Sequence, residues 1–298
     1  MVLVSAVITT HKRRPDIVER AVKSVLSQTH SNIELFVVDD SPSDYEFREA
    51  VKQMVETYAD RNTTYIPHEK CSGACVARNT GLAAAHGEFI GFLDDDDEWC
   101  PQKVEKLLAG FDSNEVGLVY CNQTMVNDLT QETRTSNAAQ YSGFIFDRLI
   151  EFNFIGSTSF PLLRTSALRL VGGFDPEQPA LQDFDVWLKI AKEYKVNFVD
   201  EVLNVYHQHG EDQISKSSDR RIRGQKRLIE KHKEYLLSHK KAYWRRLLHL
   251  IPEYTNNKQY KKAMGVWLKA SLLRPWAMKM NFSYLLIVVK SMIRSIIK

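Results

Sequence analysis

The chain has 298 residues and a hydrophobic share of 44%, enough for one large domain or for a domain with an appendage. Its four cysteines, Cys71, Cys75, Cys100 and Cys121, show neither Cys-x-x-Cys pairs nor the histidine spacing of a zinc finger, which favours free thiols in the reducing cytoplasm. No run of about 18 uncharged apolar residues is present, so the sequence predicts no transmembrane span, and the apolar N-terminus is too short for a signal peptide.

The net charge of +3 conceals a strong asymmetry between the two ends of the chain. Residues 219–298 hold 20 Lys and Arg against 4 Asp and Glu, a charge of +16. That leaves 20 basic and 33 acidic residues in 1–218, a charge of −13. Such asymmetry is typical of an acidic body with a basic interaction tail. We therefore expect one domain over residues 1–218 and a basic helical region over 219–298.

Residues 1–122 alternate between strand and helix patterns. The predicted strands are Val2–Thr9, Ile33–Val38, Thr63–Ile66, Glu88–Leu93 and Val116–Asn122. The predicted helices are Pro15–Ser27, Ser43 to about Ala59, about Gly73 to His86, and Pro101–Phe111. Ser43 and Glu46 form a capping box, and Gly87 suits a left-handed helix end. This alternation predicts an α/β fold with a mostly parallel, doubly wound sheet and helices on both faces.

Residues 123–218 are less periodic. The pattern there predicts short helices at Ile145–Glu151 and Thr165–Val171, and a strand at Phe160–Leu163. It also predicts a longer helix at Asp183–Glu193, whose apolar residues share one face. Strands are expected at Val196–Val199 and Val202–Tyr206.

The predicted strand Glu88–Leu93 ends in four consecutive carboxylates, Asp94–Asp97. Adjacent anions repel one another unless a cation neutralises them, and oxygen-only ligands suit Mg²⁺ or Mn²⁺, which usually complete their shell with water and substrate phosphates. An isolated acidic run would favour a solvated turn, and an EF-hand is excluded because Trp99 stands where the loop needs Gly. With the rest of the chain, the run predicts a metal site for a phosphorylated ligand at the carboxyl end of a strand.

Four segments follow one another along this region: Ser5–Thr10, Val37–Ser41, Ala77–Gly81 and Phe92–Asp97. Together they resemble the nucleotide-binding half of family 2 glycosyltransferases, which have the GT-A fold. The resemblance covers roughly residues 3–215. It implies a nucleotide-sugar-binding half over residues 1–122 and an acceptor-binding half over 123–218.

The resemblance also implies the reaction. A family 2 enzyme transfers a sugar, with inversion, from a nucleotide-sugar to a hydroxyl acceptor. For this chain it implies a UDP-sugar donor carrying a hexosyl or N-acetylhexosaminyl group. The acceptor would be a glycan or a lipid-linked glycan in bacterial surface-polysaccharide assembly, of the capsule or O-antigen type.

Three residues are candidates for the nucleoside. The first and second strands end side by side in such a sheet, so Thr9 and Asp40 can converge on one ligand, and a carboxylate there can accept an N–H from a uracil-type base. The resemblance implies this role for Asp40 and places Thr9 and His11 beside the base, although His11 stands where Tyr is more usual. A helix-cap or turn role for Asp40 is the alternative.

Arg78 lies early in a helix, and its guanidinium suits the geometry of a phosphate. The resemblance implies a contact with the ribose or the diphosphate, while the alternative is an ordinary surface Arg. It further identifies Asp94-Asp95-Asp96 as the metal-binding Asp-x-Asp element. Asp94 and Asp95 would then bind the nucleotide-sugar, with Asp95 facing the ribose, and Asp96 would bind Mn²⁺ or Mg²⁺ on the diphosphate.

Two further segments carry family-like residues. Asp97 and Glu98 are expected to be solvated, with a role in supporting the metal ligands as the alternative. In the closing segment Tyr206–Ser215, His209 matches a His that joins the metal or the diphosphate, with an ordinary surface His as the alternative. The polar stretch Gly210–Ser218 is expected to act as a lid.

The segment Leu181–Leu188 contains the expected general base. Asp183 matches the catalytic base of the family, while Gln182 stands where Glu is usual. Asp185 is the weaker candidate, because a residue two positions along a helix faces elsewhere. The alternative for Asp183 is a helix N-cap. A helix N-terminus lowers a carboxyl pKa, whereas burial or a nearby diphosphate raises it.

Two other functions are compatible with parts of the chain. A sugar-nucleotide pyrophosphorylase would need a Gly-rich, Arg-containing loop after the first strand, and the segment Thr9–Arg13 has the Arg without Gly. A non-catalytic nucleotide-sugar-binding module would not need the carboxylates of Asp96 and Asp183. Both features favour the glycosyltransferase.

The basic tail contains apolar segments edged by cations, Tyr243–Leu248 and Leu285–Arg294, together with Trp244, Trp267 and Trp276. Apolar faces with clustered Lys and Arg are typical of in-plane helices on an anionic membrane, here the inner face of the plasma membrane. A helical appendage with a solvated basic face is the alternative. The sequence contains no recognised nucleic-acid-binding motif, so we expect no nucleic-acid partner.

Overall fold

The computed structural model describes residues 1–136, 140–208 and 217–297. The chain forms two compact units, each assembled from separate segments. The first, here called the sheet unit, comprises Met1–Phe146, Phe154–Pro176 and Asp183–Gly210. The second, the helical unit, comprises Asp147–Asn153, Glu177–Gln182 and Glu211–Lys298. The helical unit therefore includes two segments that precede residue 218 in the chain.

The sheet unit is built on a nine-stranded mixed sheet in the order β3-β2-β1-β4-β8-β6-β9-β5, with β7 paired to β6. Its strands are β1 (Val4–Thr10), β2 (Ile33–Asp39), β3 (Thr63–Pro67), β4 (Phe89–Asp94), β5 (Glu98–Trp99), β6 (Val116–Asn127), β7 (Thr133–Ser136), β8 (Leu162–Arg164) and β9 (Lys195–Gln208). The neighbours β3, β2, β1 and β4 are parallel, as are β6 and β9. Between these groups, β8 runs antiparallel to both β4 and β6. The expected α/β sheet is confirmed, with β5, β7 and β8 as antiparallel additions.

One strand is longer than the sequence predicted. The two short strands expected at Val196–Val199 and Val202–Tyr206 form the single strand β9. Asp200 and Glu201 bulge out of the pairing with β6 without ending the strand, because Val199 and Val202 pair with the consecutive residues Cys121 and Asn122 of β6.

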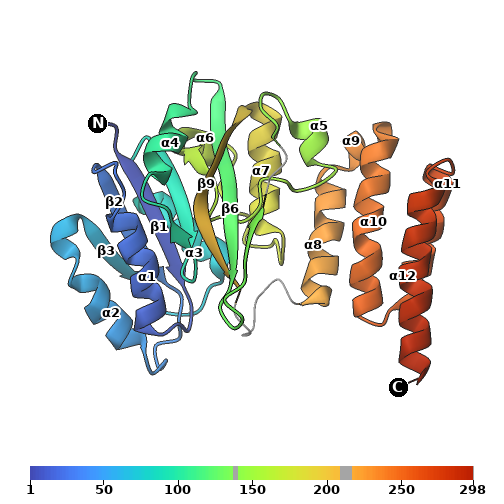
Figure 1. Cartoon of the computed structure of the whole chain (residues 1–298), viewed down its shortest axis with the longest axis horizontal. Coiled ribbons are helices and arrows are strands. Elements are labelled where there is room, and N and C mark those ends of the chain that lie inside the picture. The colour runs from blue at the N-terminus through green and yellow to red at the C-terminus, as the bar shows by residue number, and fades with distance from the viewer. Residues whose placement is uncertain (137–139, 209–216, 298) are drawn as a thin grey trace. The chain divides into compact units, whose positions relative to one another are not determined.

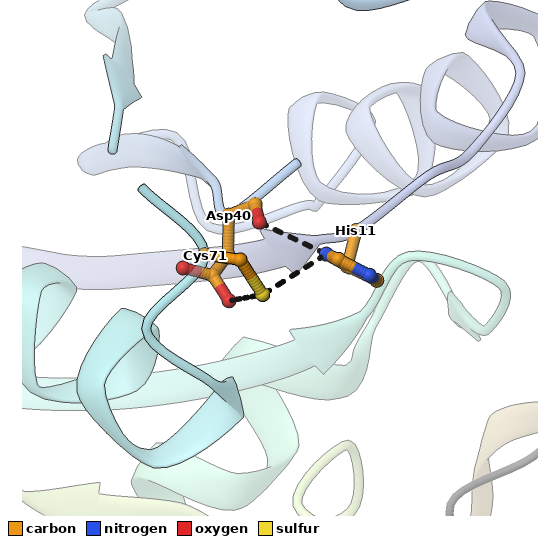
Figure 2. Close-up of side chains that lie close together, drawn as sticks. All are labelled: His11, Asp40 and Cys71. Carbon is orange, nitrogen blue, oxygen red and sulfur yellow. Dashed lines mark hydrogen bonds between the residues drawn. The ribbon is translucent and has the colours of Figure 1, made fainter. Parts of the chain in front are cut away.

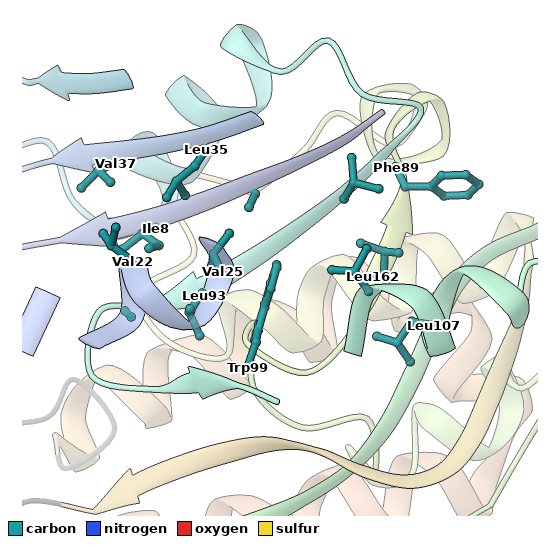
Figure 3. Packing of buried hydrophobic residues seen from close by; sticks show 14 of the residues in the cluster. Ile8, Val22, Val25, Leu35, Val37, Phe89, Leu93, Trp99, Leu107 and Leu162 are labelled. Carbon is teal, nitrogen blue, oxygen red and sulfur yellow. The ribbon is translucent and has the colours of Figure 1, made fainter. Parts of the chain in front are cut away.

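Helices cover both faces of the sheet, as expected (Figure 1). Those of the sheet unit are α1 (Pro15–Leu26), α2 (Arg48–Glu56), α3 (Ala74–Ala84), α4 (Lys103–Ala109), α6 (Thr165–Leu170) and α7 (Gln182–Glu193), with a short 3₁₀ helix at Ala59–Arg61. The short helix α5 (Phe146–Leu149) belongs mostly to the helical unit. Successive strand residues point to opposite faces. Thus Ile8 of β1 packs in one core cluster with Val22 and Val25 of α1 (Figure 3), whereas Val7 lies against Gly81 of α3.

The helix expected to begin at the Ser43–Glu46 capping box begins later, at Arg48, and no side chain caps it. The preceding residues form turns instead. The Arg48 guanidinium donates hydrogen bonds to the carbonyl oxygens of Ser41 and His68, at 2.6 and 2.5 Å. These bonds tie the loop after β2 to the loop after β3.

The helical unit contains α8 (Ser218–Lys231), α9 (Lys233–Ser238), α10 (Lys240–Asn256), α11 (Tyr260–Leu273) and α12 (Met278–Ile297). Its core is formed by α10 with residues of α8, α11 and α12. The Trp244 side chain is buried there and donates to Asn281 Oδ1, and the partly buried Trp267 donates to the Asn281 carbonyl. The segment Tyr243–Leu248 therefore belongs largely to this core, and Trp276 alone of the three tail tryptophans is exposed. Within the described residues, none of the helices has the length and apolar character needed to cross a membrane.

Gly87 lies where the loop before β4 passes the start of β1. The buried Glu34 carboxylate accepts hydrogen bonds there from the Ser5 hydroxyl, at 2.5 Å, and from the N–H groups of His86 and Gly87, at 2.6 and 3.0 Å. A Cβ on Gly87 would lie 2.6 Å from the Ser5 backbone nitrogen. Gly87 is thus required by close backbone packing, and the left-handed helix end expected for it was wrong, because α3 ends at an extended Ala85 and Gly87 has no positive φ.

The substitution Gly87→Ala is expected to lower the free energy of unfolding by about 1–3 kcal/mol, because the added methyl group overpacks the junction with β1. Gly265→Ala is the matched control. Gly265 lies within α11, and a Cβ added there would have no atom within 4 Å, so we expect a gain of about 0.5–1 kcal/mol. Urea denaturation followed by circular dichroism measures both, and equal stability of Gly87→Ala and wild type would contradict this account.

Candidate active site

The carboxyl ends of β1, β2 and β4 meet at one edge of the sheet. The parallel register places Thr9 opposite Val38 on one side and Asp94 on the other, and Thr10 opposite Asp39. Thr9 is partly exposed at this edge. The register therefore brings a residue expected near the base next to the first residue of the acidic run, at the position where open α/β sheets bind ligands.

Asp40 follows β2 and is held by hydrogen bonds on both carboxylate oxygens. Oδ1 accepts from the Ser72 N–H at 2.7 Å and faces His68 Nδ1 at 2.8 Å, while Oδ2 accepts from the Gly73 N–H at 2.7 Å and from the Cys71 thiol at 3.4 Å. Burial alone would raise the pKa of Asp40, but these hydrogen bonds outweigh it and keep the pKa below its usual value. Asp40 is therefore an ionised, fixed carboxylate.

His11 and Cys71 lie beside Asp40 and form one wall with it (Figure 2). His11 Nδ1 is 2.9 Å from the Asp40 carbonyl oxygen, and one potential ligand atom from each of the three residues lies within 4.8 Å of the others. A metal would need the Cys71 thiolate. Burial and the hydrogen bond to Asp40 instead raise the thiol pKa, so the thiol stays protonated at neutral pH. The donor set thus fits a polar ligand better than a metal ion.

Arg78 projects from α3 toward the acidic run. Its guanidinium donates to Asp94 Oδ1 at 2.8 Å and lies 5.5 Å from the centre of the Phe174 ring. Arg78 is only 9% exposed, which excludes the alternative of an ordinary surface residue. Asp94 also accepts from the hydroxyls of Ser157 and Thr158, at 3.2 and 3.1 Å. Arg78 and Asp94 therefore form one fixed pair at the sheet edge.

Asp95 and Asp96 are both paired to Arg13, which lies in the loop after β1. Arg13 Nε donates to Asp95 Oδ1 at 2.9 Å, and Arg13 Nη2 donates to Asp96 Oδ2 at 2.6 Å. Arg20 of α1 donates to the Asp96 carbonyl at 2.7 Å. Burial, together with the charges of Asp95 and Asp94, raises the pKa of Asp96 to about 7. Asp96 is therefore poised to change protonation near neutral pH.

Asp97 is not solvated, so the expectation was wrong for this residue, whereas Glu98 is partly exposed. Asp97 is fully buried and accepts from the His207 N–H at 3.2 Å, and burial with the charges of Asp94 and Asp96 raises its pKa strongly. Glu98 is paired to His207 Nε2 at 2.9 Å, and this hydrogen bond lowers the Glu98 pKa. Strand β9 runs alongside β5 here and covers the acidic turn, which nothing in the local sequence indicated. His209, expected near the metal, and most of the expected lid lie outside the described residues.

Asp183 lies in the first turn of α7 and is half-buried. Because α7 begins at Gln182, Asp183 is not the N-cap. Burial raises its pKa to about 6, opposed by a 2.7 Å hydrogen bond from the Phe184 N–H and by the charge of Arg78. The charge of Asp94 adds to the rise. The structure thus places Asp183 within electrostatic reach of the Arg78–Asp94 pair.

The rival base, Asp185, points elsewhere. Its side chain is fully buried and lies 3.8 Å from Lys189 Nζ, one turn along the same helix. A carboxylate enclosed in this way cannot reach an acceptor hydroxyl. Asp183 as the base stays a prediction, and Asp185 is the less accessible of the two acids.

Two residues at this edge were not identified from the sequence. In the sequence, Arg13 was noted only because a pyrophosphorylase loop contains an Arg. The basic residues Lys12, Arg13 and Arg14, which follow the first strand, could have identified it as a site residue. Tyr206 begins the segment that resembles the closing segment of the family, but its own pattern is that of an ordinary strand residue. Its pKa is raised to about 12 by burial and by the charges of four carboxylates, those of Asp97, Asp94, Asp96 and Asp183.

Sequence comparisons agree with this geometry. The glycosyl transferase family 2 model matches residues 5–171, and a second model, glycosyl transferase family group 2, matches residues 89–297. The putative colanic acid biosynthesis glycosyl transferase WcaA of Escherichia coli K12 is 32% identical over 261 residues, covering 80% of this chain and 89% of that protein. The Escherichia coli UDP-Glc:α-D-GlcNAc-diphosphoundecaprenol β-1,3-glucosyltransferase WfgD is 29% identical over 182 residues, which cover 61% of this chain and 67% of WfgD.

Solved structures show the same fold. TarS residues 1–349 of S. aureus, in complex with UDP-GlcNAc, superposes with a TM-score of 0.65 at 18% identity, covering 96% of this chain and 81% of that one. The mannosyltransferase PcManGT of Pyrobaculum calidifontis, in complex with GDP-Man and Mn²⁺, gives a TM-score of 0.59 at 18% identity, covering 98% and 87%. Against a longer TarS chain, this chain spans 55% of its length. The chain belongs to glycosyl transferase family 2 and is a glycosyltransferase with the GT-A fold and a helical C-terminal region.

Proposed function

We propose that this enzyme transfers a hexosyl or N-acetylhexosaminyl group from a UDP-sugar to a hydroxyl of a lipid-linked glycan, with inversion and with the help of Mn²⁺ or Mg²⁺. The observation that carries the proposal is Asp183, a half-buried carboxyl group whose pKa is raised to about 6 and which lies within electrostatic reach of Arg78 and Asp94. A group of this kind can accept a proton at neutral pH.

The chemistry of the donor and the acceptor is supported by relatives. TarS was solved with UDP-GlcNAc, and WfgD is named for a UDP-Glc donor and an α-D-GlcNAc-diphosphoundecaprenol acceptor. WcaA is named for colanic acid biosynthesis. We therefore propose a role in surface-polysaccharide assembly at the inner face of the plasma membrane. The pyrophosphorylase alternative loses its one support, because Arg13 is bonded to the acidic run.

The nucleoside is proposed to bind along Thr9, His11 and Asp40. Asp40 already has four hydrogen-bonding neighbours, so an incoming base N–H would replace the weakest of them. That neighbour is the Cys71 thiol, because thiols are weak donors and its contact at 3.4 Å is the longest. Arg78 and Asp95 would then lie on the ribose and diphosphate side.

The cation is proposed to bind at Asp96, with His209 as a further ligand. The donor set of clustered carboxylate oxygens fits a hard divalent ion, and PcManGT was solved with Mn²⁺. Burial, and after it the charges of Asp95 and Asp94, raise the pKa of Asp96, and a cation would relieve the part that comes from these charges. A bound cation would supply Lewis-acid stabilisation of the leaving diphosphate. Arg13, now paired with Asp95 and Asp96, would keep these carboxylates in place.

Asp183 is proposed to act as the general base. Its Oδ1 is oriented by the Phe184 N–H, so the carboxylate has a fixed direction. Direct displacement requires the base to take the proton of the acceptor hydroxyl as that oxygen attacks the anomeric carbon. Burial and the charge of Asp94 keep the Asp183 pKa closer to the working pH than that of a free Asp, which improves a base.

The substitution Asp183→Asn is expected to reduce sugar transfer about 10²–10⁴-fold, because the amide cannot accept the proton. Affinity for UDP should change less than about twofold, since Asp183 is not proposed to touch the nucleotide. Asp16→Asn is the matched control, an exposed Asp in the first turn of α1. Transfer rates and calorimetric UDP affinity measure both variants. Near wild-type transfer by Asp183→Asn would remove Asp183 as the base.

Transfer at saturating cation should fall about tenfold per pH unit below pH 6 and level off above it. Below this pH, Asp183 binds a proton and cannot accept another, because its pKa is raised to about 6. The residual activity of Asp183→Asn should lack this limb. A wild-type profile that stays flat down to pH 4.5 would contradict the assignment.

The substitution Asp96→Ala is expected to abolish the dependence of UDP binding on Mn²⁺, while Asp112→Ala, an exposed acid outside the site, should leave it intact. Because the pKa of Asp96 is raised to about 7, cation binding to wild type at pH 7 should release protons. Calorimetry in buffers of different ionisation enthalpy measures this release. Equal UDP affinity of wild type with Mn²⁺ and with chelator would contradict the metal site.

A further inference from the structure

Helix α12 carries a stripe of exposed apolar side chains along most of its length. The stripe consists of Met278, Phe282, Leu286, Val289 and Ile293, which are between 37% and 74% exposed. Their spacing of three and four residues keeps them on one face of the helix. A different face holds the fold together, because Asn281 and Val288 of the same helix are buried in the helical unit.

The stripe belongs to a concentrated apolar surface. Among the described residues, 17 large hydrophobic side chains are exposed, and 10 of them lie between Leu268 and Ile293. Scattered exposed apolar residues need no explanation, but a concentration on adjoining helices marks an interaction surface. Trp276, 68% exposed just before α12, belongs to this set.

A row of cations runs beside the stripe. Lys279, Lys290 and Arg294 each follow a stripe residue by one position, which places them about 100° further round the helix. All three side chains are exposed, and none forms a salt bridge within the described parts of the chain. Long basic side chains in this position can lie along an apolar surface while their charges reach an anionic layer.

The surrounding sequence contains no negative charge. Residues 254–298 hold nine Lys and Arg and no Asp or Glu. In a symmetric dimer, the stripes of the two copies would face each other. Lys279, Lys290 and Arg294 of the two copies would then approach one another, without an acid from α11 or α12 to pair them. Charge complementarity therefore favours an anionic partner over a second copy.

We propose that α12 binds in the plane of an anionic phospholipid bilayer, with the stripe inserted between the headgroups and the basic row on their phosphates. Phe282 and Ile293 would enter the apolar layer, and Trp276 would lie at its polar boundary, where indole rings are favoured. The helix lies on the membrane and does not cross it. This contact does not depend on the proposed sugar transfer, so either can fail alone.

The test is co-sedimentation of the full-length protein with vesicles of phosphatidylcholine alone or with phosphatidylglycerol added. We expect binding only to the anionic vesicles, weakening when the salt is raised from 0.1 to 1 M, because the Debye length falls from about 10 to 3 Å. Lys279→Gln with Lys290→Gln should lower the partition coefficient about 30-fold, from about 1 kcal/mol per cation. The charge-matched control is Lys52→Gln with Lys192→Gln, on the sheet unit, and should change it less than about twofold.

The apolar contribution has its own pair of variants. Phe282→Glu should lower the partition coefficient at least about tenfold, because a buried Phe contributes about 1.5–3 kcal/mol. Leu129→Glu, at a 78% exposed Leu of the sheet unit, should not lower it beyond twofold. Unchanged circular dichroism and thermal unfolding show that each variant folds, as expected at exposed positions.

Either of two kinds of result would overturn the proposal. One is equal sedimentation with neutral and anionic vesicles, or an equal loss of binding in the test and control variants. The other is a wild-type protein that stays in the supernatant but is dimeric by light scattering and becomes monomeric on Phe282→Glu. In that case the stripe is an interface between copies of the chain.

Discussion

Four consecutive carboxylates at the end of a buried strand are the constraint on which this active site depends. Two like charges about 4 Å apart repel by about 4 kcal/mol at the effective dielectric constant of a protein surface. The fold compensates in two ways. Arg13 and Arg78 pair with the run from the loop after β1 and from α3, and burial together with the neighbouring charges raises the pKa values of Asp96 and Asp97, which favours proton binding by these two carboxyls. A site that holds protons in place of positive charge is one that a divalent cation can occupy in exchange for them.

This electrostatic field extends beyond the run itself. The charge of Asp94 contributes to the raised pKa of Asp183, and the pKa of Tyr206 rises in the same field. Under the proposed mechanism, the cation and the base are therefore linked through Asp94. A cation would lower the Asp183 pKa, whereas the donor diphosphate would raise it again. Arg78 is coupled to both residues, because it donates a hydrogen bond to Asp94 and its charge lowers the pKa of Asp183. Its position explains why a surface role does not fit it.

Local sequence patterns predicted what depends on neighbours along the chain. The alternation of strands and helices, and the position of Thr9 and of the acidic run at the carboxyl ends of their strands, follow from periodicity and from family motifs. The errors arose where distant segments decide. Asp97 looked solvated because only β9, more than a hundred residues later, covers it. Gly87 was given a helix-ending role because its close packing on Ser5 is a tertiary contact. Trp244 looked like a membrane anchor because its partner Asn281 is 37 residues away.

The opposite charges of the two ends suit the two proposed ligands, a nucleotide-sugar at the acidic body and an anionic bilayer at the basic end. A nucleotide-sugar brings a diphosphate to an acidic body, which can accept it only where cations intervene, through arginines and a bound divalent ion. An anionic bilayer would repel that same body, so a membrane contact needs its own surface. Residues 254–298, with nine basic residues and no acid, provide one. If the acceptor is lipid-linked, both proposals require the enzyme to meet an anionic surface while keeping an acidic catalytic edge. The chain satisfies both demands because half of its basic residues, and few of its acids, lie beyond residue 218. The net charge of +3 is the sum of a negative body and a positive C-terminal region, so it does not indicate a neutral surface.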